Sequence, residues 1–80
     1  MPKVLKLGPY RFSFYSRELN EPPHVHVRRD RFEAKYWLDP VELAQNRRFP
    51  RHELHQIEAL VNEHRSRLLE QWHGYFGTQE

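Results

Sequence analysis

The sequence predicts a small α+β domain, in which an antiparallel sheet of three to four strands is covered on one face by one long C-terminal helix. Residues 10–38 alternate apolar and polar side chains with the period of two that is typical of strands. Residues 50–76 repeat apolar side chains at spacings of three and four, as an amphipathic helix does. Because the strands precede the helix and no linker divides the chain, we expect a single domain over residues 1–80.

The expected strands are residues 10–16, 24–28 and 31–38, and residues 41–45 form either a fourth strand or a turn of helix. Prolines and a glycine in residues 1–9 limit any strand in this lead-in segment. Alternation places on the helix-facing side of the sheet Tyr10, Phe12, Phe14, Val25, Val27, Phe32, Ala34 and Tyr36. The opposite side, here called the open face, then carries Arg11, Tyr15, His24, His26, Arg28, Lys35 and Trp37.

The predicted helix begins at Pro50, since proline suits the first helical position. Glu53 lies in the first turn, where the helix dipole favours a carboxylate. It ends at Gly74 or Gly77, which makes it roughly 35–40 Å long at 1.5 Å per residue. Its apolar stripe consists of Leu54, Ile57, Val61, His64, Leu68, Trp72 and Tyr75.

Composition excludes several classes of protein. The 80 residues contain no cysteine, which rules out disulfides and thiolate metal sites, and no apolar run reaches the length of a membrane span. A cytoplasmic protein is therefore expected. The net charge of +2 is too small to indicate nucleic-acid binding by itself. A chain this short buries a lean core, so we expect a partner protein or a homodimer interface.

The segment Glu21–Arg28 concentrates the ionisable chemistry. A metal-independent ribonuclease needs a base and an acid that titrate near neutral pH and cations for the phosphate. His24 and His26 fit the first two roles and Arg28 the third. A platform for single-stranded RNA would add, from the same face, Arg11, Tyr15, Lys35 and Trp37.

Three other interpretations stay open. His24 and His26 have a spacing found in zinc sites, with Glu33, Glu21 or His64 as a third ligand, although the helix register places His64 on the other side of the sheet. We predict neither a metal nor a cofactor. Residues 17–23 are polar and end in two prolines, and we call them the proline loop. In the simplest interpretation, His24 hydrogen-bonds the proline loop and His26 is an ordinary surface residue. Finally, the open face could dock a partner protein through its aromatic and arginine side chains.

The segment Asn20–Val27, followed by a hairpin, Pro50, His64 and the Leu68–Trp72 pattern, resembles a small bacterial family, domain of unknown function 4160 (DUF4160). The similarity covers roughly residues 8–76. It implies a place beside a second small family, DUF2442, in pairs proposed as toxin–antitoxin modules. This chain would then be the toxin-like member and a DUF2442-type protein its antitoxin-like partner. The resemblance also marks His24, His26 and His64 as candidate site residues.

Overall fold

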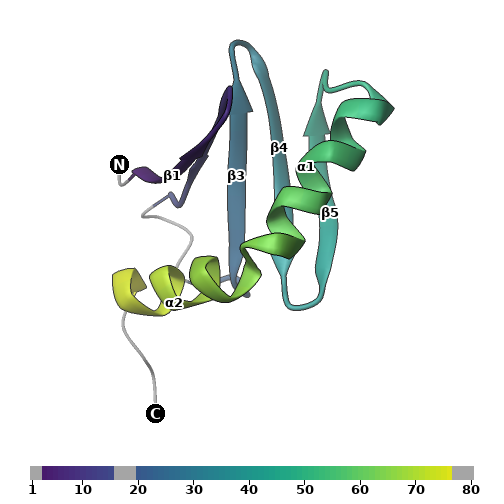
Figure 1. The fold of residues 1–80 in the computed structure, drawn as a ribbon. Coiled ribbons are helices and arrows are strands. Elements are labelled where there is room, and N and C mark those ends of the chain that lie inside the picture. The colour runs from purple at the N-terminus through teal and green to yellow at the C-terminus, as the bar shows by residue number, and fades with distance from the viewer. Residues whose placement is uncertain (1–2, 16–19, 77–80) are drawn as a thin grey trace.

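Five antiparallel strands and two helices make up the computed structural model, which describes residues 3–15 and 20–76 (Figure 1). The strands lie side by side in chain order, as β1 (Lys3–Leu7), β2 (Tyr10–Ser13), β3 (His24–Arg29), β4 (Phe32–Leu38) and β5 (Val41–Arg47). Helix α1 (Arg51–Glu63) crosses β4 and β5, and α2 (Arg65–Phe76) lies across one end of the sheet (Figure 1). Among the described residues, neither helix is long and apolar enough to cross a membrane.

The α+β class and the order of strands before helices are confirmed, but the sheet has more strands than predicted. Residues 3–7 form an edge strand because Gly8 adopts a φ of 60° and turns the chain directly into β2. Residues 41–47 form a strand rather than a helical turn, since they pair with the edge of β4. Ser16 and Gly77, where the predicted strand 10–16 and the longer predicted helix end, lie outside the described residues.

The single long helix is instead two helices with a break at His64. His64 ends α1 with φ −106° and ψ 17°, and its ring Nδ1 lies 3.0 Å from the carbonyl oxygen of Leu60. Arg65 then begins α2 and donates to the carbonyl of Leu38 at 2.6 Å and to Asp39 at 2.8 Å. One straight helix would carry its last turns past the sheet, whereas the break returns Leu68 and Trp72 to the core.

The predicted helix-facing residues of the sheet are buried, except for Phe32, which is half-buried against the core. Alternation therefore assigned this face correctly. The helices complete the core with Ile57, Val61, Leu68 and Trp72.

A partly buried ion pair joins the first turn of α1 to the sheet. Arg29 donates to both carboxylate oxygens of Glu53, through Nε to Oε2 at 2.6 Å and through Nη2 to Oε1 at 2.9 Å. Tyr10 donates its hydroxyl to Oε2 at 2.8 Å. The hydrogen bonds from Arg29 outweigh the effect of burial and hold the pKa of the Glu53 carboxyl below its ordinary value of 4.5.

Replacing Glu53 by glutamine is expected to lower the free energy of unfolding at pH 7 by about 2 kcal/mol, since hydrogen bonds to a charged group are lost. A lowered carboxyl pKa stabilises the fold above the ordinary value of 4.5, and this contribution disappears as the pH falls through the folded-state pKa. The difference between wild type and Glu53→Gln should therefore shrink from pH 7 to pH 3 in urea unfolding. Glu58→Gln, at an exposed position of α1, is the control. An equal difference at both pH values would contradict this account.

Candidate functional site

The sheet register brings the predicted open-face residues of neighbouring strands together in rows. Arg11 lies opposite Arg28, and His26 lies opposite Lys35. His24 pairs with Trp37 at the end of the sheet that α2 crosses. Directly paired residues share a face, so the pairs confirm that these six side chains start from the same side of the sheet.

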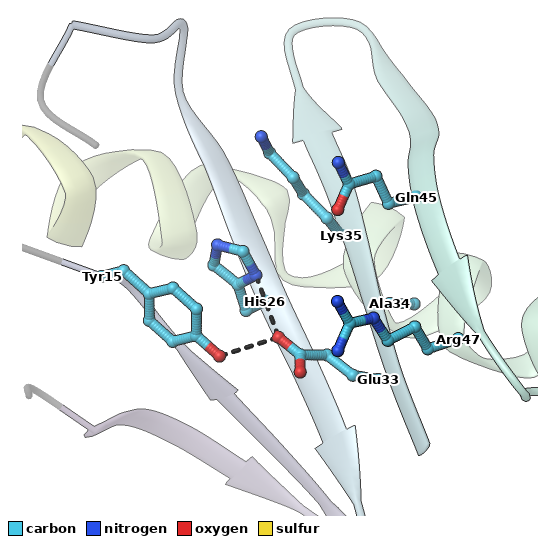
Figure 2. A pocket seen from close by; sticks show the side chains of 7 residues that line it. All are labelled: Tyr15, His26, Glu33, Ala34, Lys35, Gln45 and Arg47. Carbon is cyan, nitrogen blue, oxygen red and sulfur yellow. Dashed lines mark hydrogen bonds and ion pairs between the residues drawn. The ribbon is translucent and has the colours of Figure 1, made fainter. Parts of the chain in front are cut away.

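The open face is hollowed between β3, β4 and β5. The hollow has a volume of about 280 Å³ and is lined by Tyr15, His26, Glu33, Ala34, Lys35, Gln45 and Arg47. Figure 2 shows its polar side chains on the side of the sheet opposite the helices.

His26, Glu33 and Tyr15 form the most closely packed group in this hollow (Figure 2). The rings of Tyr15 and His26 stack, with centroids 3.8 Å apart and planes inclined by 12°. The hydroxyl of Tyr15 donates to Oε2 of Glu33 at 2.7 Å, and Nδ1 of His26 lies 3.4 Å from the same oxygen. The imidazole is therefore held between an aromatic ring and a carboxylate.

This arrangement favours one tautomer of His26. A carboxylate that faces Nδ1 favours a proton on that nitrogen, which leaves the lone pair on Nε2. In hydrolytic triads, a carboxylate that accepts a hydrogen bond from Nδ1 orients the histidine base, and the corresponding atoms here are 3.4 Å apart. Glu33 is thus suited to position His26 for proton transfer.

Lys35 is buried in spite of its charge, with 8% of the residue exposed. Its amine donates to Glu21 at 2.6 Å and lies 4.7 Å from the centre of the Trp37 ring. The carboxylate and the ring together stabilise the ammonium group at the rim of the hollow. The proline loop is thereby tied to the sheet through Glu21.

His24 has a different environment from His26, because its ring is fully buried. Its Nδ1 lies 2.9 Å from the carbonyl oxygen of Pro22, as the simplest interpretation of the sequence expected. The ring packs against Trp72 of α2, with centroids 4.9 Å apart, and edge-on against Trp37. These contacts favour a role in anchoring the proline loop over a role in contact with substrate. His26 is also buried, with 5% of the residue exposed, so its interpretation as an ordinary surface residue was wrong.

Nδ1 of the His64 ring lies 3.0 Å from the carbonyl oxygen of Leu60 on α1. Within residues 3–15 and 20–76, no three histidine, aspartate or glutamate side chains are grouped so that they could hold a metal ion. The geometry of the described residues thus offers no three-ligand site that includes His24 and His26.

Sequence reasoning missed Gln45 and Arg47, which line the hollow, and it considered Glu33 only as a metal ligand or as a cross-strand partner of Arg28. Glu33 could have been found, because it precedes Lys35 by two residues and so shares its face. The others lie on β5, whose existence the sequence left open.

Residues 10–73 match the sequence profile of the family described as "Domain of unknown function (DUF4160)". The chain belongs to the DUF4160 family. The match includes β2 to β5, α1 and most of α2, and therefore every residue that lines the hollow of this DUF4160 domain. Comparisons with curated proteins and with solved structures give no match.

Proposed function

We propose that this DUF4160 protein is the toxin-like member of a toxin–antitoxin pair, acts in the cytoplasm, and cleaves single-stranded RNA at the hollow without a metal. The observation that supports the proposal is the placement of His26 against Glu33 and Tyr15, with Nδ1 3.4 Å from the carboxylate. A histidine oriented in this way is a suitable general base.

In the proposed reaction, Nε2 of His26 accepts the proton of a ribose 2′-hydroxyl, and the 2′-oxygen attacks the adjacent phosphorus. The bond from phosphorus to the 5′-oxygen breaks, and that oxygen takes a proton from water. The products are a 2′,3′-cyclic phosphate and a 5′-hydroxyl. Arg28 and Arg47, which flank Glu33 on the neighbouring strands, would stabilise the charge on the phosphate.

The alternative, a non-catalytic domain that docks a partner protein, would use Tyr15 and Trp37 as anchors. Both rings already pack within the chain, Tyr15 on His26 and Trp37 against His24 and the Lys35 amine. Both side chains are only partly exposed, so part of each ring is already covered within the chain. The antitoxin-like partner, for which a DUF2442-type protein is the candidate, would in our proposal cover the open face and block cleavage.

The test is to incubate the purified full chain with an unstructured, end-labelled RNA in the presence of a chelator. We expect fragments that end in a 2′,3′-cyclic phosphate. A DNA strand of the same sequence is the matched control and should stay intact, because it lacks the 2′-hydroxyl. Induction of the chain alone should also arrest bacterial growth. Intact RNA in the presence of folded protein would refute cleavage, and the docking alternative would then be tested by co-purification.

A further inference from the structure

A row of cations crosses the open face from one edge of the sheet to the other. Lys6 of β1 lies opposite Arg11, Arg11 opposite Arg28, Arg28 opposite Glu33, and Glu33 opposite Arg47 of β5. We call Lys6, Arg11, Arg28 and Arg47 the cation row. All four residues are exposed. With neighbouring strands about 4.8 Å apart, the row extends over about 19 Å.

Glu33 separates Arg28 from Arg47, but on β1 to β3 the cation row differs from an ordinary solvated sheet face, on which opposite charges usually face each other across strands. Like charges directly opposite each other destabilise a sheet, and here Lys6 faces Arg11 and Arg11 faces Arg28. In the part of the chain that the structure describes, none of the four takes part in a salt bridge, whereas Arg29, Lys35 and Arg65 do. Within the described residues, no salt bridge therefore offsets the repulsion between Lys6, Arg11 and Arg28.

The cation row also borders the hollow. Arg47 and Glu33 line it, and His26 precedes Arg28 by two residues on β3, a distance of about 7 Å along a strand. An extended chain of phosphates bound along the row would thus pass beside the imidazole.

We propose that the cation row is a phosphate track that binds several successive phosphates of a single RNA strand, which runs across the strands from β1 to β5. Charge complementarity selects the occupant, because a line of exposed cations suits the line of negative charges along a nucleic-acid backbone. The choice of RNA rests on the proposed function. Binding by the track does not require cleavage, so the two can fail independently.

The test compares two double variants that remove the same net charge from different places. Lys6→Gln/Arg11→Gln removes the two track cations of β1 and β2, neither of which lines the hollow. Arg51→Gln/Arg67→Gln removes two exposed cations from the helices. Affinity for a 2′-O-methyl RNA oligonucleotide, which cannot be cleaved, is measured by fluorescence anisotropy at several salt concentrations.

We expect the track variant to bind at least tenfold more weakly and its salt dependence, log K against log salt, to become shallower by about 1.4, because two phosphate contacts are lost. The helix variant should keep the wild-type slope. The track variant should also melt at or above the wild-type temperature, since it removes a repulsive pair.

Equal losses in both double variants would overturn the track in favour of attraction by overall charge. A polyglutamate peptide that competes with the oligonucleotide at equal charge concentration would overturn it in favour of an acidic protein partner. Absence of binding by the wild-type chain would also overturn it. If RNA is bound with the expected salt slope but never cut, the track stands and the cleavage proposal fails.

Discussion

Replacing His26 by asparagine is expected to slow RNA cleavage by about 10²–10⁴-fold, the usual contribution of a general base. Asparagine keeps a polar group of similar reach opposite Glu33 but cannot accept a proton at neutral pH. RNA binding along the cation row should change little, because the positive charges of the row remain. The measurement is the initial cleavage rate of a labelled RNA, with binding followed separately.

The matched control is His55→Asn, an exposed histidine on α1 that lies on the other side of the sheet from the hollow. It should cleave at the wild-type rate. Circular dichroism shows whether the His26 variant is folded, which matters because 95% of His26 is buried (5% exposed) and its ring stacks on Tyr15. A folded His26→Asn protein with wild-type activity would exclude His26 as the base.

Truncation of Trp72 to alanine is expected to lower the free energy of unfolding by about 3–5 kcal/mol, the usual cost of deleting a large buried aromatic side chain. Trp72 is 5% exposed and contacts three other rings, those of Phe14, Phe76 and His24, with centroids 5.2, 4.1 and 4.9 Å away. A domain of this size has a total stability of only about 4–12 kcal/mol. A large part of the protein should therefore unfold at 37 °C, as urea unfolding followed by circular dichroism would show.

Tyr75→Ala provides the comparison for Trp72, because Tyr75 is 43% exposed although it belongs to the same aromatic group. Tyr75→Ala should lower the free energy of unfolding by clearly less than Trp72→Ala does. Trp72→Phe should restore part of the loss by refilling the space. A cost below about 1 kcal/mol for Trp72→Ala would mean that the contacts of α2 contribute little to the fold.

The local signals of the sequence predicted the candidate site only in part. Alternation along β3 and β4 placed His26, Arg28 and Lys35 on one face, and the register agrees. The burial of both histidines did not follow from alternation, because it depends on Trp72 covering His24 and Tyr15 stacking on His26. Those contacts join residues that are far apart along the chain, which local patterns do not describe.

The turn between β3 and β4 shows a similar limit. It lacks the usual glycine, and Asp30 adopts the positive φ of 57° instead, which aspartate tolerates better than most residues. Strand β3 consequently extends to Arg29, whose side chain reaches Glu53 on α1. The expected strands, residues 24–28 and 31–38, left Arg29 in the turn between them, and the sequence offered no reason to pair it with a helix.

The sequence by itself determined the α+β class, the order of strands before helix, and the face to which the residues of the three predicted strands point. These properties follow from the periods of two and 3.6, which are intrinsic to strands and helices. The tertiary structure decided that β1 and β5 join the sheet, that the helix breaks at His64 and that Lys6 and Arg47 complete the cation row. Each of these depends on the free energy of pairing or packing one segment against another, to which the local pattern of side chains contributes only one of the two surfaces.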